Sequence, residues 1–318
     1  MSKKAYRVRN WKDYNEALVK RGSITFWFDE EILSKWYSVE KKREKGRPEK
    51  YSDTAIHCGL TLRALLGLTL RSTEGFFKSL MQLMKLELDV PDYTSLCKRQ
   101  KTLHFRLPQM KKKSGERLDI VIDTTGLKIY GEGEWRVRSH GKTQRRRWRK
   151  VHLAINSQTQ EIEACCLTDQ KIQDCEGLPL LLNQIEMPVN KVIADGAYDR
   201  FSCYEEAEKR RCEGIFPPQR NASTSKKRPE NKKKGSWEAV IKRDKAIEEV
   251  ERIGRKEWKI KTGYHKRSLA ETGMFRLKTL LGDRLSARCL ENQRAELNIR
   301  CYIINKMTAL GMPQTVAI

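Results

Sequence analysis

The stretch LDIVIDTT, residues 118–125, decides how the rest of the chain is interpreted. Its run of apolar residues predicts a strand within a sheet. Two further strands are predicted downstream, RKVHLAIN (149–156) and EIEACCLTD (161–169). Gln158 and Thr159 lie at the turn between them, so these two strands are expected to form a hairpin. The region therefore opens with three consecutive strands, which we expect to be antiparallel.

Beyond these strands, helical and extended patterns alternate. A helix is predicted over 175–187, a strand over 191–199, a helix over 201–212 and a short strand over 214–218. Three antiparallel strands followed by alternating helix and strand is the order of a ribonuclease H-like layer. The expected fold class is therefore α/β, with a mixed sheet flanked by helices.

Helical patterns dominate the first hundred residues. Asp53, Ser72 and Asp92 are each placed to cap a helix, the three helices running through TAIHCGLTLRALLGL, TEGFFKSLMQLMKL and YTSLCKRQKTL. The last two resemble a helix-turn-helix DNA reader whose second helix presents Lys98 and Arg99 to DNA. Any compact helical domain has a similar pattern, so the motif by itself is weak evidence.

The change from helical patterns to strand patterns sets the expected domain boundaries. Residues 1–110 are predicted to form a helical N-terminal, DNA-binding domain, and residues 111–318 a ribonuclease H-like catalytic domain, with the basic linker MKKKSGER at the junction. Residues 219–257 are predicted as a basic insertion or loop, because QRNASTSKKRPENKKKG is polar and nearly free of apolar residues. From Gly263 the chain is expected to be helical almost to its end.

Charge is the strongest compositional signal. The chain has 65 Lys and Arg against 41 Asp and Glu, a net charge of +24 and a pI near 9.7. This balance favours nucleic acid as the partner, since no amphipathic anchor or lipidation motif points to a membrane. The N-terminus has no apolar signal segment and the nine cysteines form no CxxC pair, which together favour reduced thiols in the cytosol.

Two acids lie where a charge is costly. Asp123 lies within the apolar strand, where an unpaired carboxylate costs several kcal/mol unless it binds a metal or a partner. Asp195 ends the strand of VIADGAYD, and Gly196 lets the backbone turn there, leaving the carboxylate at the strand's carboxyl edge, where sites form in open α/β sheets. Either acid alone could equally be a cap or turn residue.

A third acid lies in TGYHKRSLAETGMFRLKTLL (262–281). On a helix with about 100° per residue, Tyr264 and the residues 3, 7 and 14 positions later fall within an arc of roughly 60°. One stripe would then carry an aromatic hydroxyl, a guanidinium, a carboxylate and an ammonium. These are Tyr264, Arg267, Glu271 and Lys278. A solvated face with ion pairs is the ordinary alternative, so geometry alone is suggestive.

The same four residues match the YREK signature, Tyr-x2-Arg-x3-Glu-x6-Lys, of bacterial insertion-sequence transposases. The surrounding segments also resemble the group called insertion-sequence family five. They include TFWFDEEIL, GRPEKYSDTAI, IDTTGLKIYGEGEWRVRSHG, RRRWRKVHLAIN, ADGAYD and GYHKRSLAETGMFRLKTLLG. The resemblance runs from about Asn10 to NKMTALGMP (305–313), and the loop 219–257 is its weakest part.

The resemblance implies a DNA transposase with Asp123, Asp195 and Glu271 as its catalytic, metal-binding triad. It implies two Mg²⁺ ions, with substitution by Mn²⁺ left open, and oxygen ligands suit such hard cations. Tyr264, Arg267 and Lys278 would contact DNA. The implied partners are double-stranded DNA, as terminal inverted repeats and target, and a second copy of the chain in a homodimer, all within the bacterial cytosol or nucleoid.

Other interpretations stay open at this stage. A related nuclease or resolvase would cut branched DNA without joining it, and a DNA-binding regulator would have lost catalysis, although all three acids are present. Inverted repeats flanking the gene would favour the transposase. Trp148, in the basic run QRRRWRKVH (144–152), either lies on an exposed strand edge or stacks on a displaced base.

Overall fold

The structure is a computed structural model that describes residues 6–39, 48–103, 107, 116–129, 148–228, 230 and 235–317. The chain divides into two compact units. One comprises Met1–Arg106 together with Ala287–Ile318, and the other comprises Leu107–Ser286. The carboxyl-terminal segment thus belongs with the helical unit, which differs from the expected division into 1–110 and 111–318. The physical reason is α13 (Leu290–Leu310), which packs against α1, α4 and α6.

The helical unit is built from short helices around α13. A two-stranded antiparallel sheet of β1 (Tyr6–Val8) and β8 (Thr315–Ala317) joins the two ends of the described chain. Among the described residues, no helix has both the length and the apolar character needed to cross a membrane. The remaining helices are α1 (Trp11–Arg21), α2 (Ile24–Trp27), α3 (Glu30–Ser34), α4 (Asp53–Leu66), α5 (Leu70–Leu83) and α6 (Tyr93–Thr102).

Side-chain caps start the three predicted helices. Asp92 caps α6 by accepting a hydrogen bond from the Ser95 N–H, as expected. The first two helices begin earlier than expected. Ser52 caps α4, so that Asp53 becomes its first residue, and Thr69 caps α5. In both cases a hydroxyl upstream of the expected cap accepts a hydrogen bond from an N–H group of the first turn, so the helix begins there.

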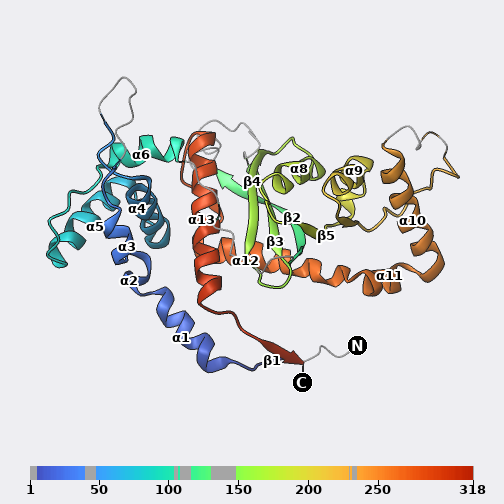
Figure 1. Cartoon of the computed structure of the whole chain (residues 1–318), viewed down its shortest axis with the longest axis horizontal. Helices are drawn as coiled ribbons and strands as arrows, with labels where there is room; N and C mark the ends of the chain where they lie inside the picture. Colours follow the sequence, from blue (N-terminus) through green and yellow to red (C-terminus); the bar gives the residue numbers. More distant parts are fainter. Residues whose placement is uncertain are drawn as a thin grey trace, which may run out of the picture. The chain divides into compact units, whose positions relative to one another are not determined.

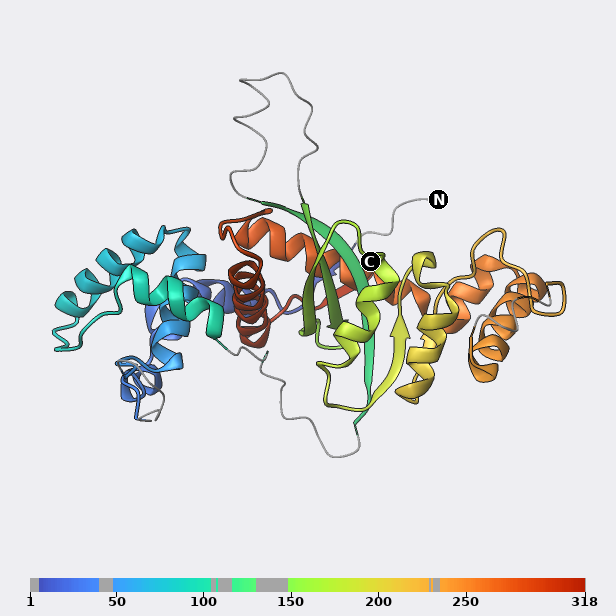
Figure 2. The same cartoon turned by 90° about the horizontal axis from the view of Figure 1, so that it is seen from above.

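The second unit contains a six-stranded mixed sheet with the order β4-β3-β2-β5-β6, and β7 pairs with β2 (Figures 1 and 2). β2, β3 and β4 are antiparallel neighbours, whereas β5 and β6 run parallel to β2. This is the expected ribonuclease H-like arrangement, and the predicted fold class is confirmed. The strands are β2 (Leu118–Ile129), β3 (Trp148–Asn156), β4 (Ile162–Asp169), β5 (Val189–Ile193), β6 (Glu213–Ile215) and β7 (Arg284–Leu285).

Helices cover both faces of this sheet. Ile120 and Ile122 of β2 lie in a core with α8 (Gly177–Leu182) and α9 (Phe201–Lys209). The alternate residues of β2, including Asp123, face the other side, where α12 (Ser268–Leu281) packs on β2 and β3. α12 approaches closely at Gly273, where a Cβ would lie 2.2 Å from the Ile155 Cδ1 atom. The carboxylate of Asp123 is therefore placed between the sheet and α12.

The prediction that 219–257 is a loop is wrong over much of its length. α10 (Trp237–Ile253) and α11 (Arg255–Thr262) occupy this region. α10 packs against α9 and buries Val240, Arg243, Asp244 and Ile247, which recur at helical spacing. The polar composition of the first half of the segment concealed this amphipathic second half.

The region after Gly263 is also less uniform than expected. Gly263 ends α11 in the left-handed conformation that favours glycine (φ 72°). A short 3-10 helix, η4 (Tyr264–Arg267), follows and leads into α12. The chain then breaks at Gly282 and adds β7 beside β2 before α13 begins. In place of the expected continuous helix there are three helices, η4, α12 and α13, with the short strand β7 between the last two.

A buried ion pair anchors α10 to the rest of the unit. The Arg243 Nε atom donates to Asp199 Oδ1 at 2.8 Å, and Arg243 Nη2 donates to Asp199 Oδ2 at 3.0 Å. Asp199 also accepts the Gln219 N–H at 3.0 Å, and its side chain is fully buried. Asp199 directly follows the turn after β5, so α10 is fixed to the segment that carries Asp195.

Replacing Arg243 by Met should destabilise the protein by about 3–5 kcal/mol, because the buried Asp199 carboxylate would lose its partner. Lys242→Ala is the matched control. Lys242 is the preceding residue on α10 and pairs with Glu208 in an exposed position, so its loss should cost less than about 1 kcal/mol. Urea denaturation followed by tryptophan fluorescence measures both, and equal shifts of the two midpoints would contradict the anchoring role.

Candidate active site

Strand pairing places Asp123 and Asp195 side by side. Val121 of β2 pairs with Ile193 of β5 in parallel register, and each acid lies two residues further along its chain. Parallel strands lie about 4.8 Å apart, so this register sets the two backbones close together at the same sheet edge. Asp195 lies just beyond β5 rather than within it. It caps the 3-10 helix η2 (Gly196–Tyr198), and its Oδ1 accepts the Ala197 N–H at 2.9 Å.

Glu271 reaches the site from α12. Arg267, one turn earlier, donates to Glu271 and lies 3.4 Å from the Asp123 Oδ2 atom. The guanidinium thus bridges the carboxylate of the strand and the carboxylate of the helix. The Glu271 side chain is 58% exposed, whereas that of Asp123 is 20% exposed. Glu271 therefore lies on the solvent-exposed side of the site, and Asp123 is the more buried of the two carboxylates.

The predicted stripe forms in a different way from that expected. Tyr264 and Arg267 belong to the 3-10 helix η4, so only Glu271 and Lys278 lie on the α-helix. The Lys278 Nζ atom donates to the Thr125 hydroxyl at 2.6 Å, two residues beyond Asp123 on β2. The Tyr264 ring packs near Trp258, and the Lys259 ammonium lies over it at 5.1 Å. All four residues nevertheless lie near the middle of β2, around Asp123 and Thr125.

The charges of these groups act on one another. The pKa of Asp123 is raised, chiefly by burial, and the nearby charges of Asp195 and Glu271 raise it further. The Thr124 N–H and the Arg267 guanidinium oppose that rise. Burial likewise raises the pKa of the Tyr264 phenol, with smaller contributions from the same three carboxylates. Three acids therefore repel each other in one partly buried place, where a cation is favoured.

The donor set suits a hard divalent cation, since it consists of carboxylate oxygens. In the described part of the chain, however, no three His, Cys, Asp or Glu side chains converge closely enough to form a metal site as they stand. Arg267 supplies the compensating positive charge between Asp123 and Glu271. The residues fit a metal ion if Glu271 exchanges its partner Arg267 for the cation.

Residues that the sequence reasoning did not consider lie on the opposite face of β2. The Thr124 hydroxyl lies 3.0 Å from His152 Nδ1 and 3.2 Å from the Tyr198 hydroxyl. His152 Nε2 lies 2.8 Å from the Thr168 hydroxyl. His152 is fully buried, and burial lowers its pKa to about 4. A histidine in the middle of the apolar strand VHLAIN was the available signal.

The predicted N-terminal DNA contacts differ in their surroundings. Lys98 is exposed on α6. Arg99 is largely buried, where it pairs with Asp53 and Glu49 and donates to the Tyr51 carbonyl at 2.9 Å. Its guanidinium thus joins α6 to the start of α4. Lys98 is thus the more exposed residue of the pair.

Trp148 begins β3, and its ring packs on Gly126 with the Lys128 ammonium 5.9 Å from the ring centre. Most of the basic run before Trp148 and of the linker around residues 110–117, together with 231–234, falls outside the described residues.

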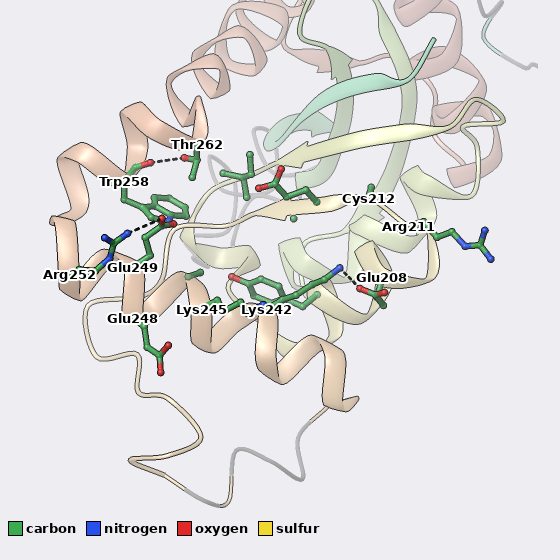
Figure 3. A pocket seen from close by; sticks show the side chains of 15 residues that line it. Glu208, Arg211, Cys212, Lys242, Lys245, Glu248, Glu249, Arg252, Trp258 and Thr262 are labelled. Carbon is green, nitrogen blue, oxygen red and sulfur yellow. Dashed lines mark hydrogen bonds and ion pairs between the residues drawn. The ribbon is translucent and has the colours of Figure 1, made fainter. Parts of the chain in front are cut away.

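A separate cavity of about 810 Å³ lies between α9, β6, α10 and α11 (Figure 3). Trp258 and Tyr204 line it together with several charged side chains. Four of those charged residues form two ion pairs, Lys242 with Glu208 and Arg252 with Glu249. The residues that line the cavity include none of the three acids Asp123, Asp195 and Glu271, so it is distinct from the candidate active site.

Comparison with known proteins gives two family matches and a structural likeness. Residues 19–132 and residues 114–306 each match a family described as transposase DDE domain. A piggyBac transposase in a synaptic complex with hairpin DNA, solved by cryo-electron microscopy, is 10% identical with a TM-score of 0.38, over 98% of this chain and 80% of that chain. Because the second family match alone spans more than half of the sequence, this chain belongs to the transposase DDE domain family, whose members are generally dependent on divalent metal ions.

Proposed function

We propose that this protein is the transposase of an insertion sequence. It binds the terminal inverted repeats of the element, hydrolyses the phosphodiester bonds at the element ends and transfers the resulting 3′-hydroxyl ends into target DNA. The observation that carries this proposal is the arrangement of Asp123, Asp195 and Glu271 around the middle of β2 in a chain of the DDE domain family.

The subgroup is part of the proposal. Tyr264, Arg267, Glu271 and Lys278 have the spacing of the YREK signature, and together with the flanking segments they favour insertion-sequence family five. The support from the structure is that all four residues lie near the middle of β2, where Asp123 is placed. Their roles as DNA contacts follow from that position.

Asp123, Asp195 and Glu271 would hold two Mg²⁺ ions, and Mn²⁺ would substitute for them. When bound, such a pair lowers the pKa of a coordinated water and stabilises negative charge on the attacking and leaving oxygens. The protein's own contribution is rigid placement. β2 fixes Asp123, and the turn after β5 fixes Asp195 through the bond from the Ala197 N–H. Glu271 is exposed on α12 and free to rotate toward them when Arg267 leaves it.

The basic residues would then act on the phosphates. The planar guanidinium of Arg267 can donate two hydrogen bonds to one phosphate. A phosphate near the scissile bond would replace Glu271 as the partner of Arg267. Lys278 lies beside Thr125 and offers a second positive charge. Tyr264 stays a neutral phenol because burial raises its pKa, so it can donate a hydrogen bond to a phosphate oxygen or a base. These residues orient the backbone for in-line attack.

The two reactions share one site. In the first, a water oxygen bonds to phosphorus, the bond from phosphorus to the 3′-oxygen breaks, and that oxygen takes up a proton. In the second, the freed 3′-hydroxyl loses its proton and bonds to a target phosphorus, and a 3′-oxygen of the target strand leaves. Neither step needs a protein nucleophile, in agreement with a site built from carboxylates, cations and hydroxyls.

The partner is double-stranded DNA. The net charge of +24 favours a polyanion, and Lys98 is exposed on α6 for contact with an element end. A homodimer would let two element ends be cut together. The place of action would be the bacterial cytosol or nucleoid, where the DNA lies.

Replacing Asp123 or Asp195 by Asn, or Glu271 by Gln, should abolish cleavage of end-containing DNA in Mg²⁺ while changing DNA binding only a few-fold. Each change keeps the side-chain shape and removes the charge that would hold the metal. Asp119→Asn is the matched control, because Asp119 lies on the same strand and contacts Asn190 and Lys266 outside the site. Near-wild-type cutting by any of the three variants would falsify the assignment of that acid.

Lys278→Ala should slow single-turnover cleavage about tenfold or more, equivalent to about 1.4 kcal/mol of transition-state stabilisation. Arg276→Ala is the control. It is a basic residue two positions earlier on α12, about 160° away around the helix axis, and should change the chemical step little. Saturating protein and a thermal melting curve separate chemistry from binding and folding. Similar losses for both variants would reduce the role of Lys278 to general electrostatics.

Binding to duplex DNA should weaken steeply with salt, with a log–log slope steeper than about −4. Lys98→Ala should flatten that slope by about 0.9, the effect of one lost phosphate contact. Lys35→Ala, which removes an exposed lysine already paired with Glu31 on α3, should leave the slope unchanged. Fluorescence anisotropy over a salt series measures all three slopes. An unaltered slope for Lys98→Ala would remove α6 from the DNA interface.

A further inference from the structure

A chain of polar side chains crosses the sheet beneath the candidate active site. It begins at Thr168 on β4, continues through His152 on β3 and Thr124 on β2, and ends at Tyr198 in η2. Thr124 directly follows Asp123, but its side chain lies on the opposite face of β2. The polar chain therefore lies on the face of the sheet opposite to the Asp123 carboxylate and α12.

Burial makes this chain costly to build unless every member is hydrogen-bonded. His152 is fully buried and Tyr198 is 1% exposed. Gly177, the first residue of α8, lies against the His152 ring, where a Cβ would be 2.4 Å from the Nδ1 atom. Because the ring stays neutral, one of its nitrogens donates and the other accepts, which satisfies both neighbouring hydroxyls. An apolar side chain at each position would fill the same space without these requirements.

Both residues of the Thr124–Tyr198 contact are hydrogen-bonded to one of the two aspartates, Thr124 to a carboxylate and Tyr198 to a backbone carbonyl. On β2, the Thr124 N–H donates to Asp123 Oδ1 at 2.9 Å. In η2, the Tyr198 N–H donates to the Asp195 carbonyl oxygen at 3.1 Å, within the turn that Asp195 caps. The hydroxyl–hydroxyl bond of 3.2 Å thus connects the two segments beyond the point where the ladder between β2 and β5 ends.

We propose that Thr124 and Tyr198 are positioning residues that hold Asp123 and Asp195 in the relative arrangement that binds divalent metal. This inference rests on the proposed function of those two acids. The two residues touch neither DNA nor metal. They act by fixing the backbone on which the carboxylates stand, and His152 and Thr168 fix Thr124 in turn. Outer residues of this kind commonly change metal affinity by 10–100-fold when they are replaced.

Tyr198→Phe tests the proposal with a minimal change, because it removes only the hydroxyl. The full-length chain without DNA is titrated with Mn²⁺ alone, and free Mn²⁺ is followed by electron paramagnetic resonance. Tyr198→Phe should raise the Kd about tenfold. Tyr204→Phe is the matched control. Tyr204 is also a buried tyrosine, its hydroxyl donates to the Phe216 carbonyl at 3.4 Å, and it lies on α9 with no hydrogen bond to either carboxylate segment. Its Kd should stay within about twofold of the wild type, by the same reasoning.

A second pair of variants leaves Tyr198 unchanged, so the test does not depend on whether Tyr198→Phe folds normally. Thr124→Val keeps the size of the side chain but removes the hydroxyl that meets both His152 and Tyr198, so it should weaken Mn²⁺ binding at least as much as Tyr198→Phe. Thr124→Ser restores the hydroxyl and should bring the Kd back toward the wild-type value. A purely structural role would instead make the smaller Ser the more disruptive change.

Asp123→Asn separates the two levels of the argument. If Asp123→Asn does not weaken Mn²⁺ binding, the proposed metal role of the acids is wrong, and the inference falls with it. If Asp123→Asn weakens binding but Tyr198→Phe and Tyr204→Phe behave alike, the positioning role alone is overturned. Weaker binding for Tyr198→Phe and Thr124→Val, with Tyr204→Phe and Thr124→Ser near the wild type, supports it.

Discussion

The parallel pairing of β2 with β5 is the constraint on which the candidate site depends. Its register places Asp123 and Asp195 at equivalent positions, each two residues beyond the pair of Val121 and Ile193. Burial raises the pKa of Asp123, and the nearby charges of Asp195 and Glu271 raise it further. A protein tolerates such an arrangement when a cation compensates it. In this structure Arg267 supplies part of that compensation, and in the proposed function metal ions supply the rest.

Different residues lie on the two faces of the sheet around the pairing of β2 with β5. On one face, α12 brings Glu271 and Lys278 to β2, and its close approach at Gly273 sets how near they come. On the other face, a buried polar chain through His152 supports the same part of β2. The reacting groups and their support are thus separated by the thickness of a single strand.

The helices α10 and α11 show how an insertion can become part of a site's framework. The buried pair of Arg243 and Asp199 fixes α10 to the turn after Asp195. The chain then passes through α11 and Gly263 into η4, which carries Tyr264 and Arg267. The helices α10 and α11 therefore connect the segment of Asp195 with Tyr264 and Arg267. A free loop in this place would leave η4 without that connection.

The sequence alone predicted the α/β class and the succession of strands and helices between residues 118 and 218, because apolar strands and helices are local patterns. It also singled out three acids and the spaced YREK residues as candidates for the site. It also predicted the cap of α6 at Asp92, since capping depends on neighbouring residues. Only the tertiary structure decided what distant segments do. Arg99 pairs with Asp53 rather than facing outward, residues 237–253 form a helix because α9 covers their apolar side, and the segment from Ala287 joins the helical unit. The link from Thr124 to His152 and Tyr198 likewise depends on three segments meeting in space, and no local pattern encodes such a meeting.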